Sequence, residues 1–334
     1  MLLGVIGGGQ LGRMLALAGI PLGLSFRFLD PSPDAPADEV GELLVGAYDD
    51  SELLDRLADG AAAVTYEFEN VPVAAAERVG ALPPAAALEA SQDRLVEKQL
   101  FRRLGIPTAR IDDEVETFPA ILKTRRLGYD GKGHQLVETR PGSDPGQVLE
   151  ERVPFDRELS LIAVRGTDGD TRFWPLVENV HEDGILRTSR APALEAPQAE
   201  AEEYGARLLD ELRYVGVLAL ELFEVDGHLL ANEFAPRVHN TGHWTIEGSA
   251  TSQFENHLRA ILGLPLGSTE SRPSVLLNLI GSAPSAQDVL GIADAHLHLY
   301  GKEPRPGRKL GHVTLVDPTP ERERELRDLV AKQH

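Results

Sequence analysis

The chain has 334 residues and a formal net charge of −20, from 33 Lys and Arg against 53 Asp and Glu. A chain of this length suits two or three domains rather than one core. The acidic balance argues against nucleic acid or an anionic membrane as a partner, because no general basic face is expected. The absence of cysteine excludes disulfides, thiolate chemistry and cysteine-ligated zinc.

No targeting or membrane segment is expected. The opening residues, MLLGVIGGGQLG, lack a basic region and reach glycine too early for a signal peptide. No apolar run approaches the ~20 residues that are needed to cross a bilayer. We therefore expect a cytoplasmic protein.

The first predicted unit is a strand, a glycine turn and a helix. Residues 2–6 (LLGVI) predict a buried strand, which GGGQLG (7–12) and an apolar helix follow. The N–H groups of such a corner can bind an anion. The three glycines of the G-x-G-x-x-G pattern, with Asp30 ending the next strand, also satisfy the dinucleotide fingerprint. A tight turn in any doubly wound domain explains them equally well.

A second group of polar residues follows the predicted strand within AAAVTYEFENVP (61–72). Glu67, Glu69 and Asn70 come at the carboxyl end of that strand, where open α/β sheets bind ligands. They either face a polar substrate or form a solvated loop. Strands and helices alternate to about residue 90, which predicts a parallel-sheet domain.

A helix, a lysine and a glycine-rich loop come next. Ser91 is expected to cap a helix over QDRLVEKQLFRRL, whose four cations (Arg94, Lys98, Arg102 and Arg103) indicate a mostly solvated face. The strand AILKT then brings Lys123 before the loop RRLGYDGKG (125–133). A lysine beside a mobile glycine loop can neutralise a polyphosphate while backbone N–H groups cover it. The loop is not a Walker A motif, and a plain glycine-rich hairpin is the alternative.

A crossover near residue 150 offers further ligand groups. The strand 148–153 ends at a Val153–Pro154 kink, and Glu158 follows on the next strand. Such a crossover can present backbone groups to a purine edge and a carboxylate to ribose hydroxyls. Another strand, 173–181, places Glu178 and His181 at its end.

The segment 218–244 predicts a hairpin that holds a cation. Asp226-Gly227 is a strong turn signal between two apolar runs, and each run contains a carboxylate, Glu221 or Glu233. A two-residue loop sets Glu221 opposite Asn232. A three-residue loop, 225–227, places both carboxylates on one face, as a metal pair requires, and we predict this second geometry. The polar residues Arg237, His239, Asn240 and His243 then suggest a substrate loop.

The last part of the chain carries a basic cluster. Strands are expected near 275–280, 296–300 and 312–316, after a helix at 252–262 and a composition break at 265–273. Four cations lie between the last two strands, and in so acidic a chain they predict an anchor for a ligand phosphate, with a solvated loop as the alternative. These cations are Lys302, Arg305, Arg308 and Lys309.

These motifs resemble the ATP-grasp superfamily and, within it, the 5-(carboxyamino)imidazole ribonucleotide synthase family of purine biosynthesis. The resemblance covers nearly the whole chain, with a valine at 238 where proline is usual and a threonine at 241 in place of serine. The matching stretches are GGGQLGRM (7–14), YEFENVP (66–72), SQDRLVEKQLF (91–101), RRLGYDGKG (125–133), PFDRELSLI (154–162), ANEFAPRVHNTGHW (231–244) and YGKEPRPGRKLGH (300–312).

The resemblance implies an α/β and α+β chain with an ATP-grasp fold. An N-terminal doubly wound, Rossmann-like domain (1–92) precedes the ATP-grasp domain (93–266), which contains a lid at about 110–165. A small β-rich C-terminal domain (267–334) follows. The family also implies a homodimer.

The resemblance further implies sites for ATP, for Mg²⁺ (with Mn²⁺ possible) and for 5-aminoimidazole ribonucleotide. Its ATP contacts fall on Arg94, Lys123, Gly128, Tyr129, Asp130, Gly131, Lys132, Gly133, His134, Glu150, Glu151, Arg152, Val153, Glu158, His181, Asn232 and Glu233, and its metal ligands on Glu221 and Glu233. Its ribonucleotide contacts fall on Gly8, Gly9, Gln10, Leu11, Glu69, Tyr129, Asp130, Lys132, Arg237, His239, Asn240, Lys302, Arg308 and Lys309.

The implied reaction is ATP-dependent carboxylation of the ribonucleotide amine by bicarbonate, through carboxyphosphate. Arg237 is expected to stabilise the charge that develops during phosphoryl transfer. Either Asp130 or His239 is expected to accept or shuttle the amine proton. A closing glycine loop would exclude water from the reactive anhydride.

Three other functions compete with this one. Another ATP-grasp ligase, such as a formate-dependent ribonucleotide transformylase or a biotin-carboxylase-like enzyme, would share the nucleotide site. A nicotinamide-dependent oxidoreductase would use the N-terminal glycines and Asp30, but it leaves Lys123 and the glutamate pair without a role. A nucleotide-binding regulatory protein would keep the fold without turnover.

Overall fold

The N-terminal part of the chain forms a parallel sheet, as predicted. The computed structural model describes residues 1–128 and 133–332. Four strands, in the order β3-β2-β1-β4, are all parallel. The strands are β1 (Leu2–Ile6), β2 (Ser25–Asp30), β3 (Glu42–Val45) and β4 (Ala61–Tyr66), joined by α1 (Gln10–Gly19), η1 (Ile20–Leu22), η2 (Pro36–Val40) and α2 (Ser51–Ala58), with α3 (Val73–Arg78) after them.

Two helices, α4 (Ala85–Ser91) and α5 (Arg94–Arg103), lead out of this sheet. The predicted N-cap was wrong, because Ser91 is the last residue of α4 and its hydroxyl donates to the Leu88 carbonyl oxygen at 3.2 Å. The alanine-rich segment 85–91 is itself helical, so the second helix begins later. Asp93 caps it and accepts from the Leu95 N–H at 3.1 Å.

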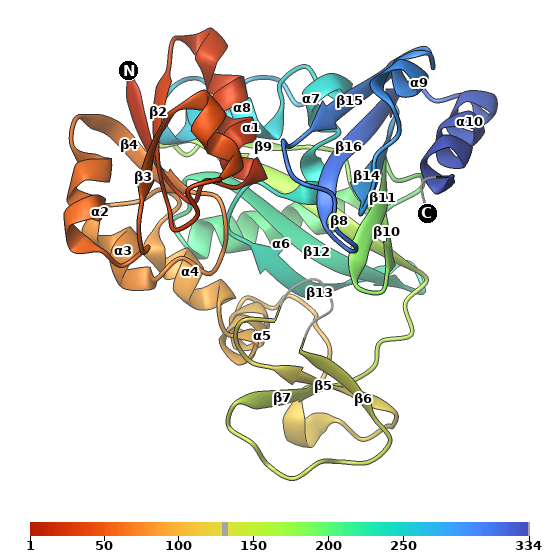
Figure 1. Ribbon diagram of the computed structural model, residues 1–334. Helices are drawn as coiled ribbons and strands as arrows, with labels where there is room; N and C mark the ends of the chain where they lie inside the picture. The colour runs from red at the N-terminus through yellow and green to blue at the C-terminus, as the bar shows by residue number, and fades with distance from the viewer. Residues whose placement is uncertain (129–132, 333–334) are drawn as a thin grey trace.

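A small lid subdomain projects away from the rest of the molecule at the bottom of Figure 1. Its antiparallel sheet has the order β6-β5-β7 and follows a short helical turn, η3 (Asp112–Glu114). Val115, Ala120 and Leu149 form its core. The strands are β5 (Ala120–Thr124), β6 (His134–Val137) and β7 (Gln147–Glu150).

The remaining strands form one large sheet, in which the neighbouring strands are antiparallel. Its order is β13-β12-β8-β10-β11-β14-β16-β15, with β9 paired to β8. β8 belongs to this sheet, although the predicted lid range extends through it. The strands are β8 (Arg157–Arg165), β9 (Thr171–Phe173), β10 (Val177–Glu182), β11 (Ile185–Ala191), β12 (Gly216–Val225), β13 (His228–Ala235), β14 (Ser274–Ile280), β15 (Ala295–Leu299) and β16 (Lys309–Val316).

Helices cover this sheet and join it to the N-terminal domain. One core packs α6 (Gln198–Glu211) against β8 and β12. A second core joins α8 (Gln253–Ile261) to the N-terminal sheet, with Leu15 and Phe26 in the same cluster as Val217 and Phe254. The other helices are η4 (Asn240–Gly242), α7 (Thr245–Gly248), α9 (Ala286–Leu290) and α10 (Pro320–Ala331). None of the helices that the structure describes is long and apolar enough to cross a membrane.

The β12–β13 hairpin differs from its predicted geometry. Val225 pairs with His228, so the loop has two residues, Asp226 and Gly227, both with positive φ, and the predicted three-residue loop was wrong. A two-residue type I′ turn matches the twist of paired strands, which favours it for Asp-Gly. The two carboxylates nevertheless pair as the metal hypothesis requires, because a β-bulge shifts the register and sets Glu221 opposite Glu233.

Candidate active site

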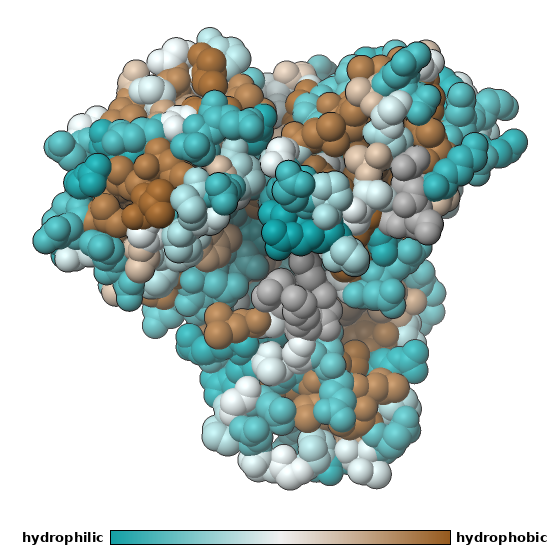
Figure 2. Space-filling view, viewed as in Figure 1, coloured by the Kyte–Doolittle hydropathy of each residue, from teal (hydrophilic) through white to brown (hydrophobic). Residues whose placement is uncertain are grey.

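The two hairpin carboxylates face a cavity of about 420 Å³ between the central sheet and the lid. Figure 2 shows this side of the molecule, where hydrophilic residues border the hollow between the upper lobes and the lid. Residues from all three sequence regions meet in the cavity. Those predicted as site residues are Glu69, Arg94, Lys123, Gly128, His134, Glu158, His181, Glu221, Asn232, Glu233, Arg237, His239, Asn240 and Lys309.

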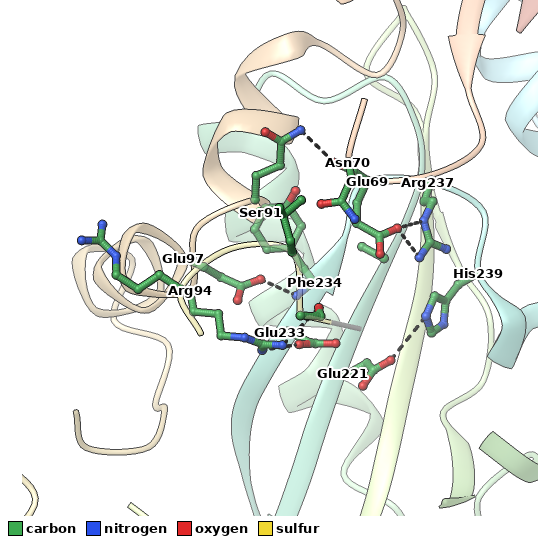
Figure 3. A pocket seen from close by; sticks show the side chains of 15 residues that line it. Glu69, Asn70, Ser91, Arg94, Glu97, Glu221, Glu233, Phe234, Arg237 and His239 are labelled. Carbon is green, nitrogen blue, oxygen red and sulfur yellow. Dashed lines mark hydrogen bonds and ion pairs between the residues drawn. The ribbon is translucent and has the colours of Figure 1, made fainter. Parts of the chain in front are cut away.

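The two carboxylates of the pair differ in their electrostatic surroundings. Burial and then the charge of Glu233 raise the pKa of Glu221 to about 8. Burial also acts against ionised Glu233, but the cations Arg94 and Lys123 outweigh it and lower the pKa of Glu233. Arg94 donates to Glu233 Oε2 at 2.8 Å, as Figure 3 shows. The negative charge of Glu233 is therefore compensated by cations of the chain itself, whereas a negative charge on Glu221 would be compensated less.

Lys123 lies at the boundary between this cavity and a second one of about 510 Å³. Its Nζ is 2.6 Å from Glu150 Oε1, and Lys98 Nζ is 3.4 Å from the other oxygen of the same carboxylate. Burial opposes the ionised form of Glu150, yet Lys98 and Lys123 lower its pKa to about 2. The Glu150 carboxylate therefore accepts a hydrogen bond from Lys123 and pairs with Lys98.

The second cavity has aromatic side chains in its wall, which suit the binding of a flat ring. Phe155 and Phe223 stack at its wall, with ring centroids 4.7 Å apart and an interplanar angle of 6°. The predicted crossover residues Glu150, Glu151, Arg152 and Val153 all line this cavity. Aromatic and other apolar side chains thus lie in the same cavity as Lys123.

Glu158 and His181 form an ion pair on the floor of the main cavity, between β8 and β10. Burial disfavours the protonated imidazole, but the hydrogen bond and charge of Glu158 outweigh it and raise the pKa of His181. The pair therefore places two hydrogen-bonded polar side chains in the cavity where both residues were predicted to contact ATP.

Arg237 and Glu69 connect the loop after β13 with the loop after β4. Arg237 Nε donates to Glu69 Oε2 at 2.5 Å, and Nη2 lies 2.5 Å from the same oxygen. The two residues are 168 positions apart in the sequence. Both side chains line the cavity beside Glu221, which Figure 3 shows.

His239 is held in one orientation above Glu221. Its Nδ1 lies 2.9 Å from Thr241 Oγ1 and accepts from the Thr241 N–H at 3.5 Å, which leaves the ring proton on Nε2. Nε2 lies 3.3 Å from Glu221 Oε1. Burial and the nearby Arg237 lower the pKa of His239 well below its usual value. His239 is therefore a neutral imidazole whose Nε2–H faces the carboxylate.

The glycine corner is occupied by carboxylates of the chain itself. The Gly12 N–H donates to Glu67 Oε2 at 2.7 Å, and the Gly9 N–H donates to the other oxygen of Glu67. The Gly8 N–H donates to Asp30 at 2.8 Å. Glu67 and Asp30 therefore act as acceptors for this corner, which corrects the substrate-facing interpretation of Glu67.

Two predicted residues of this corner differ in their surroundings. The Leu11 side chain packs in the core, whereas Gln10 Oε1 accepts from Lys302 Nζ across 292 positions of sequence. The predicted contacts of residues 8–11 with a substrate stay a prediction, and Gln10 is the polar side chain among them.

The C-terminal cations divide between two places. Lys302 contacts the glycine corner through Gln10, and Lys309 lines the main cavity. Arg308 donates to the Glu303 carbonyl oxygen at 3.2 Å.

In the glycine loop, Gly128 and His134 line the cavity, and the Gly133 carbonyl oxygen accepts from the Thr124 N–H at 2.9 Å. The predictions for Tyr129, Asp130, Gly131 and Lys132 fall outside the described residues.

Three residues beside the site were not predicted. Glu97 and Lys98 on α5 are 2% exposed, although the cations of that helix were expected to be mostly solvated. Glu97 lies three residues before the buried Leu100, and Lys98 lies three residues before the buried Phe101. This spacing was an available signal, because it places charged residues beside apolar ones on the helix surface. Gln253 was also missed. It accepts from the His239 N–H at 2.9 Å and donates to the His239 carbonyl oxygen at 2.6 Å.

Family models match three successive parts of the chain. A ribonucleotide synthetase preATP-grasp domain matches residues 1–92, an ATP-grasp domain matches 108–254, and a phosphoribosylaminoimidazole carboxylase C-terminal domain matches 274–325. Their order agrees with the three predicted regions.

Whole-chain relatives carry the same family name. N5-carboxyaminoimidazole ribonucleotide synthase of Pseudomonas aeruginosa is 52% identical over 94% of each chain. The crystal structure of the synthetase from Thermus thermophilus is 54% identical, covers 99% of both chains and has a TM-score of 0.93. The Aspergillus clavatus synthase, in complex with ADP and 5-aminoimidazole ribonucleotide, is 33% identical, with a TM-score of 0.87 and coverage of 99% of this chain and 98% of that one. The chain therefore belongs to the N5-carboxyaminoimidazole ribonucleotide synthase family of ATP-grasp ligases.

Proposed function

We propose that this site joins bicarbonate to the amine of 5-aminoimidazole ribonucleotide at the expense of ATP, which yields N5-carboxyaminoimidazole ribonucleotide, ADP and phosphate. The observation that carries the proposal is the meeting of Lys123, the pair Glu221/Glu233 and the pair Arg237/Glu69 in one cavity. A polyphosphate site and a second-substrate site thus adjoin. A relative in the same family binds ADP and this ribonucleotide.

The nucleotide would occupy both cavities. Its base would lie near Phe155 and Phe223, against the backbone of residues 150–153. Its phosphates would then extend past Lys123 toward Arg94, where both cations can neutralise them. The loop from Gly128 to His134 is proposed to cover the phosphates, as its glycines suggest.

The carboxylate pair fits Mg²⁺. Carboxylate oxygens are ligands that Mg²⁺ prefers, and the raised pKa of Glu221 reflects the cost of ionising a carboxyl group that is buried beside Glu233, a cost that a bound cation would lower. Among the described residues, no group of three or more His, Asp or Glu side chains is arranged to hold a metal ion. Glu221 and Glu233 would hold the ion. When bound, the ion would neutralise charge on the transferring phosphoryl group.

The first chemical step would activate bicarbonate. A bicarbonate oxygen attacks the γ-phosphorus, the bond from that phosphorus to the bridging oxygen breaks, and ADP leaves with carboxyphosphate formed. Lys123 and Arg237 both line the cavity and would stabilise the developing negative charge.

The second step would form the carbon–nitrogen bond. The amine nitrogen attacks the carboxyl carbon of carboxyphosphate or of the CO₂ that it releases, phosphate departs, and the nitrogen loses a proton. Asp130 and His239 remain the proposed proton acceptors. The neutral state and Nε2–H orientation of His239 suit it to donating a hydrogen bond to Glu221 in the state described here.

The ribonucleotide would lie between the N-terminal and C-terminal parts of the chain. Glu69 and Arg237 are proposed to contact its aminoimidazole end, with His239 and Asn240 beside them. The cations Lys302, Arg308 and Lys309 are proposed to hold its phosphate. Tyr129, Asp130 and Lys132 complete the proposed set, together with residues 8–11.

An ADP-release assay tests the proposal. We expect release to require 5-aminoimidazole ribonucleotide and bicarbonate together, and formate not to replace bicarbonate. Stimulation by formate instead would support a transformylase.

Glu221→Ala and Glu233→Ala are expected to abolish turnover while ATP binding persists, whereas full turnover in both variants would refute the metal pair. A homodimer, which the family implies, would be tested by analytical ultracentrifugation.

A further inference from the structure

We propose that Glu97 and Lys98 are positioning residues that hold the β-bulge at Asn232 and thereby keep Glu233 opposite Glu221. They would act through the backbone of β13 without contacting a substrate. The use of the carboxylate pair for a metal rests on the proposed function, but the bulge and its contacts do not.

The bulge changes which side chains of β13 face the cavity. Leu222 pairs with Ala231 and Glu221 pairs with Glu233, so Asn232 is the extra residue. Successive side chains of a regular strand point to opposite faces. Asn232 and Glu233 nevertheless line the same cavity. Without the bulge, the two-residue turn would set Glu221 opposite Asn232 and direct Glu233 to the other face.

The bulge lies on an edge strand that α5 covers. β13 ends the order of the sheet, and on its outer side Thr108 forms a parallel bridge with Ala231, whose N–H donates to the Pro107 carbonyl oxygen at 2.7 Å. Lys98 Nζ donates to the Asn232 carbonyl oxygen at 2.9 Å and lies 3.5 Å from the Ala231 carbonyl oxygen. Glu97 Oε1 accepts from the Phe234 N–H at 2.7 Å, a contact visible in Figure 3. These two side chains thus bind the backbone on both sides of Glu233.

The spacing on the helix explains how both contacts form at once. Glu97 and Lys98 lie three and four positions after Arg94, so both lie next to it on one side of α5. Arg94 binds the Glu233 side chain while Glu97 and Lys98 bind the flanking backbone. One helix face therefore fixes both the strand and the carboxylate that it carries.

The burial of these two residues argues that the contacts are specific. Glu97 and Lys98 are each 2% exposed, and a buried charge is costly unless it is paired and hydrogen-bonded. Lys98 meets this cost through Glu150 and the bulge carbonyls. Glu97 accepts from Phe234 in either protonation state, because a carboxyl group always keeps an accepting oxygen.

Matched substitutions on α5 test the inference. Glu97→Gln retains an oxygen that can accept from Phe234, whereas Glu97→Met removes it at similar length. Lys98→Met removes the donor to the bulge. Arg103→Met is the control, since Arg103 is on the same helix and pairs with Glu211 at 2.9 Å. Binding of Mn²⁺ in the presence of ADP would be measured by electron paramagnetic resonance, beside KM for the ribonucleotide and the crystal structure of each variant.

We expect Glu97→Met and Lys98→Met to weaken Mn²⁺ binding at least tenfold and to change KM for the ribonucleotide less than twofold. Glu97→Gln and Arg103→Met should bind Mn²⁺ as the parent does. Crystal structures of the methionine variants should show Asn232 and Glu233 on opposite faces of β13. An intact bulge with parental Mn²⁺ affinity in both methionine variants would overturn the inference.

The design separates this inference from the proposed function. If Glu221→Gln and Glu233→Gln bind Mn²⁺ as the parent does, the metal assignment fails, and the crystal structures still decide whether α5 holds the bulge. Should Lys98→Met not fold, the Glu97→Gln and Glu97→Met pair decides. Glu97→Asp, which shortens the reach of the acceptor and keeps its charge, replaces Glu97→Met if that variant does not fold.

Discussion

His239 Nε2 lies 3.3 Å from Glu221 Oε1, and the contacts of Thr241 with the other ring nitrogen make Nε2 the proton-bearing atom. The imidazole N–H thus lies next to one member of the carboxylate pair. Gln253 fixes the backbone of His239 through two further hydrogen bonds.

This geometry predicts different effects of two substitutions at position 239. His239→Ala is expected to lower kcat by about 10²-fold, a typical contribution of a positioned proton-transfer or donor group. His239→Gln places an N–H donor near the Nε2 position and is expected to recover a large part of that loss. Steady-state kcat at saturating substrates measures both. Equal losses in the two variants would show that a donor is not what the reaction requires, and would favour a base.

The raised pKa of Glu221 predicts a pH dependence of stability without metal and nucleotide. Its carboxyl group keeps a proton in the folded state up to a pH of about 8, whereas the unfolded chain loses that proton near 4.5. The folded state therefore binds more protons between these values, so stability falls as pH rises, by at most about 1.4 kcal/mol per pH unit.

Urea unfolding with EDTA at pH 5 to 8 measures this effect. The Glu221→Gln variant should gain stability relative to the parent as pH rises, because glutamine cannot ionise. Mn²⁺ affinity of the parent should also rise with pH up to about 8, since the metal requires the ionised carboxylate. A stability difference between parent and variant that does not change with pH would contradict the assignment.

Arg94 is predicted to act in nucleotide binding through its bond with Glu233. Arg94→Met removes a cation from the proposed phosphate region and leaves the negative charge of Glu233 less compensated. We expect KM for ATP to rise roughly tenfold, equivalent to about 1.4 kcal/mol, with little change in KM for the ribonucleotide. Initial rates at varied ATP measure this, and a parental KM for ATP would count against it.

The Arg237–Glu69 pair is predicted to resist conservative replacement. Two nitrogens of Arg237 reach one oxygen of Glu69, and a lysine ammonium cannot reproduce that fork. Arg237→Lys and Glu69→Gln should each lower kcat/KM for the ribonucleotide about 10²-fold. Asp55→Asn, which breaks the exposed pair with Arg78, is the control and should be neutral. Similarly small changes of kcat/KM in all three variants would show that Arg237 and Glu69 do not contribute to ribonucleotide turnover.

Glu67 is predicted to matter for stability. Its two oxygens accept from the Gly9 and Gly12 N–H groups, and a glutamine amide would oppose one of those donors. Glu67→Gln is therefore expected to destabilise the fold by about 1–3 kcal/mol, the cost of a buried donor left without an acceptor. Urea unfolding measures this, with the exposed Glu77→Gln as control. An unchanged unfolding midpoint would show that the corner tolerates the loss.

Sequence reasoning named most of the charged residues that line the candidate cavity, and the reasons for its failures are physical. Glu221, Glu233, Lys123 and Arg237 were recognisable because charged side chains beside apolar strands need compensation, and the resemblance supplied their roles. The bulge at Asn232 was not predicted, because counting positions along a hairpin assumes an uninterrupted ladder.

Two other failures arose from long-range partners. Glu67 was expected either to face a substrate or to lie in a solvated loop, because its acceptor role depends on glycines 55 and 58 positions earlier. Lys98 was grouped with solvated cations, because the carbonyl groups that it binds lie more than 130 positions away. Neither partner is visible in a local window of sequence.

The ladder between β11 and β14 limits how the chain can be divided. Thr188 pairs with Leu277 and Ala191 pairs with Ser274, so the last strands continue a sheet that begins with residues of the central region. A fragment that ends before Ser274 would uncover β11 from Thr188 to Ala191 and offer an unprotected template for strand addition. Exchange of this C-terminal segment between relatives would therefore succeed only with partners whose strand edge is complementary to β11.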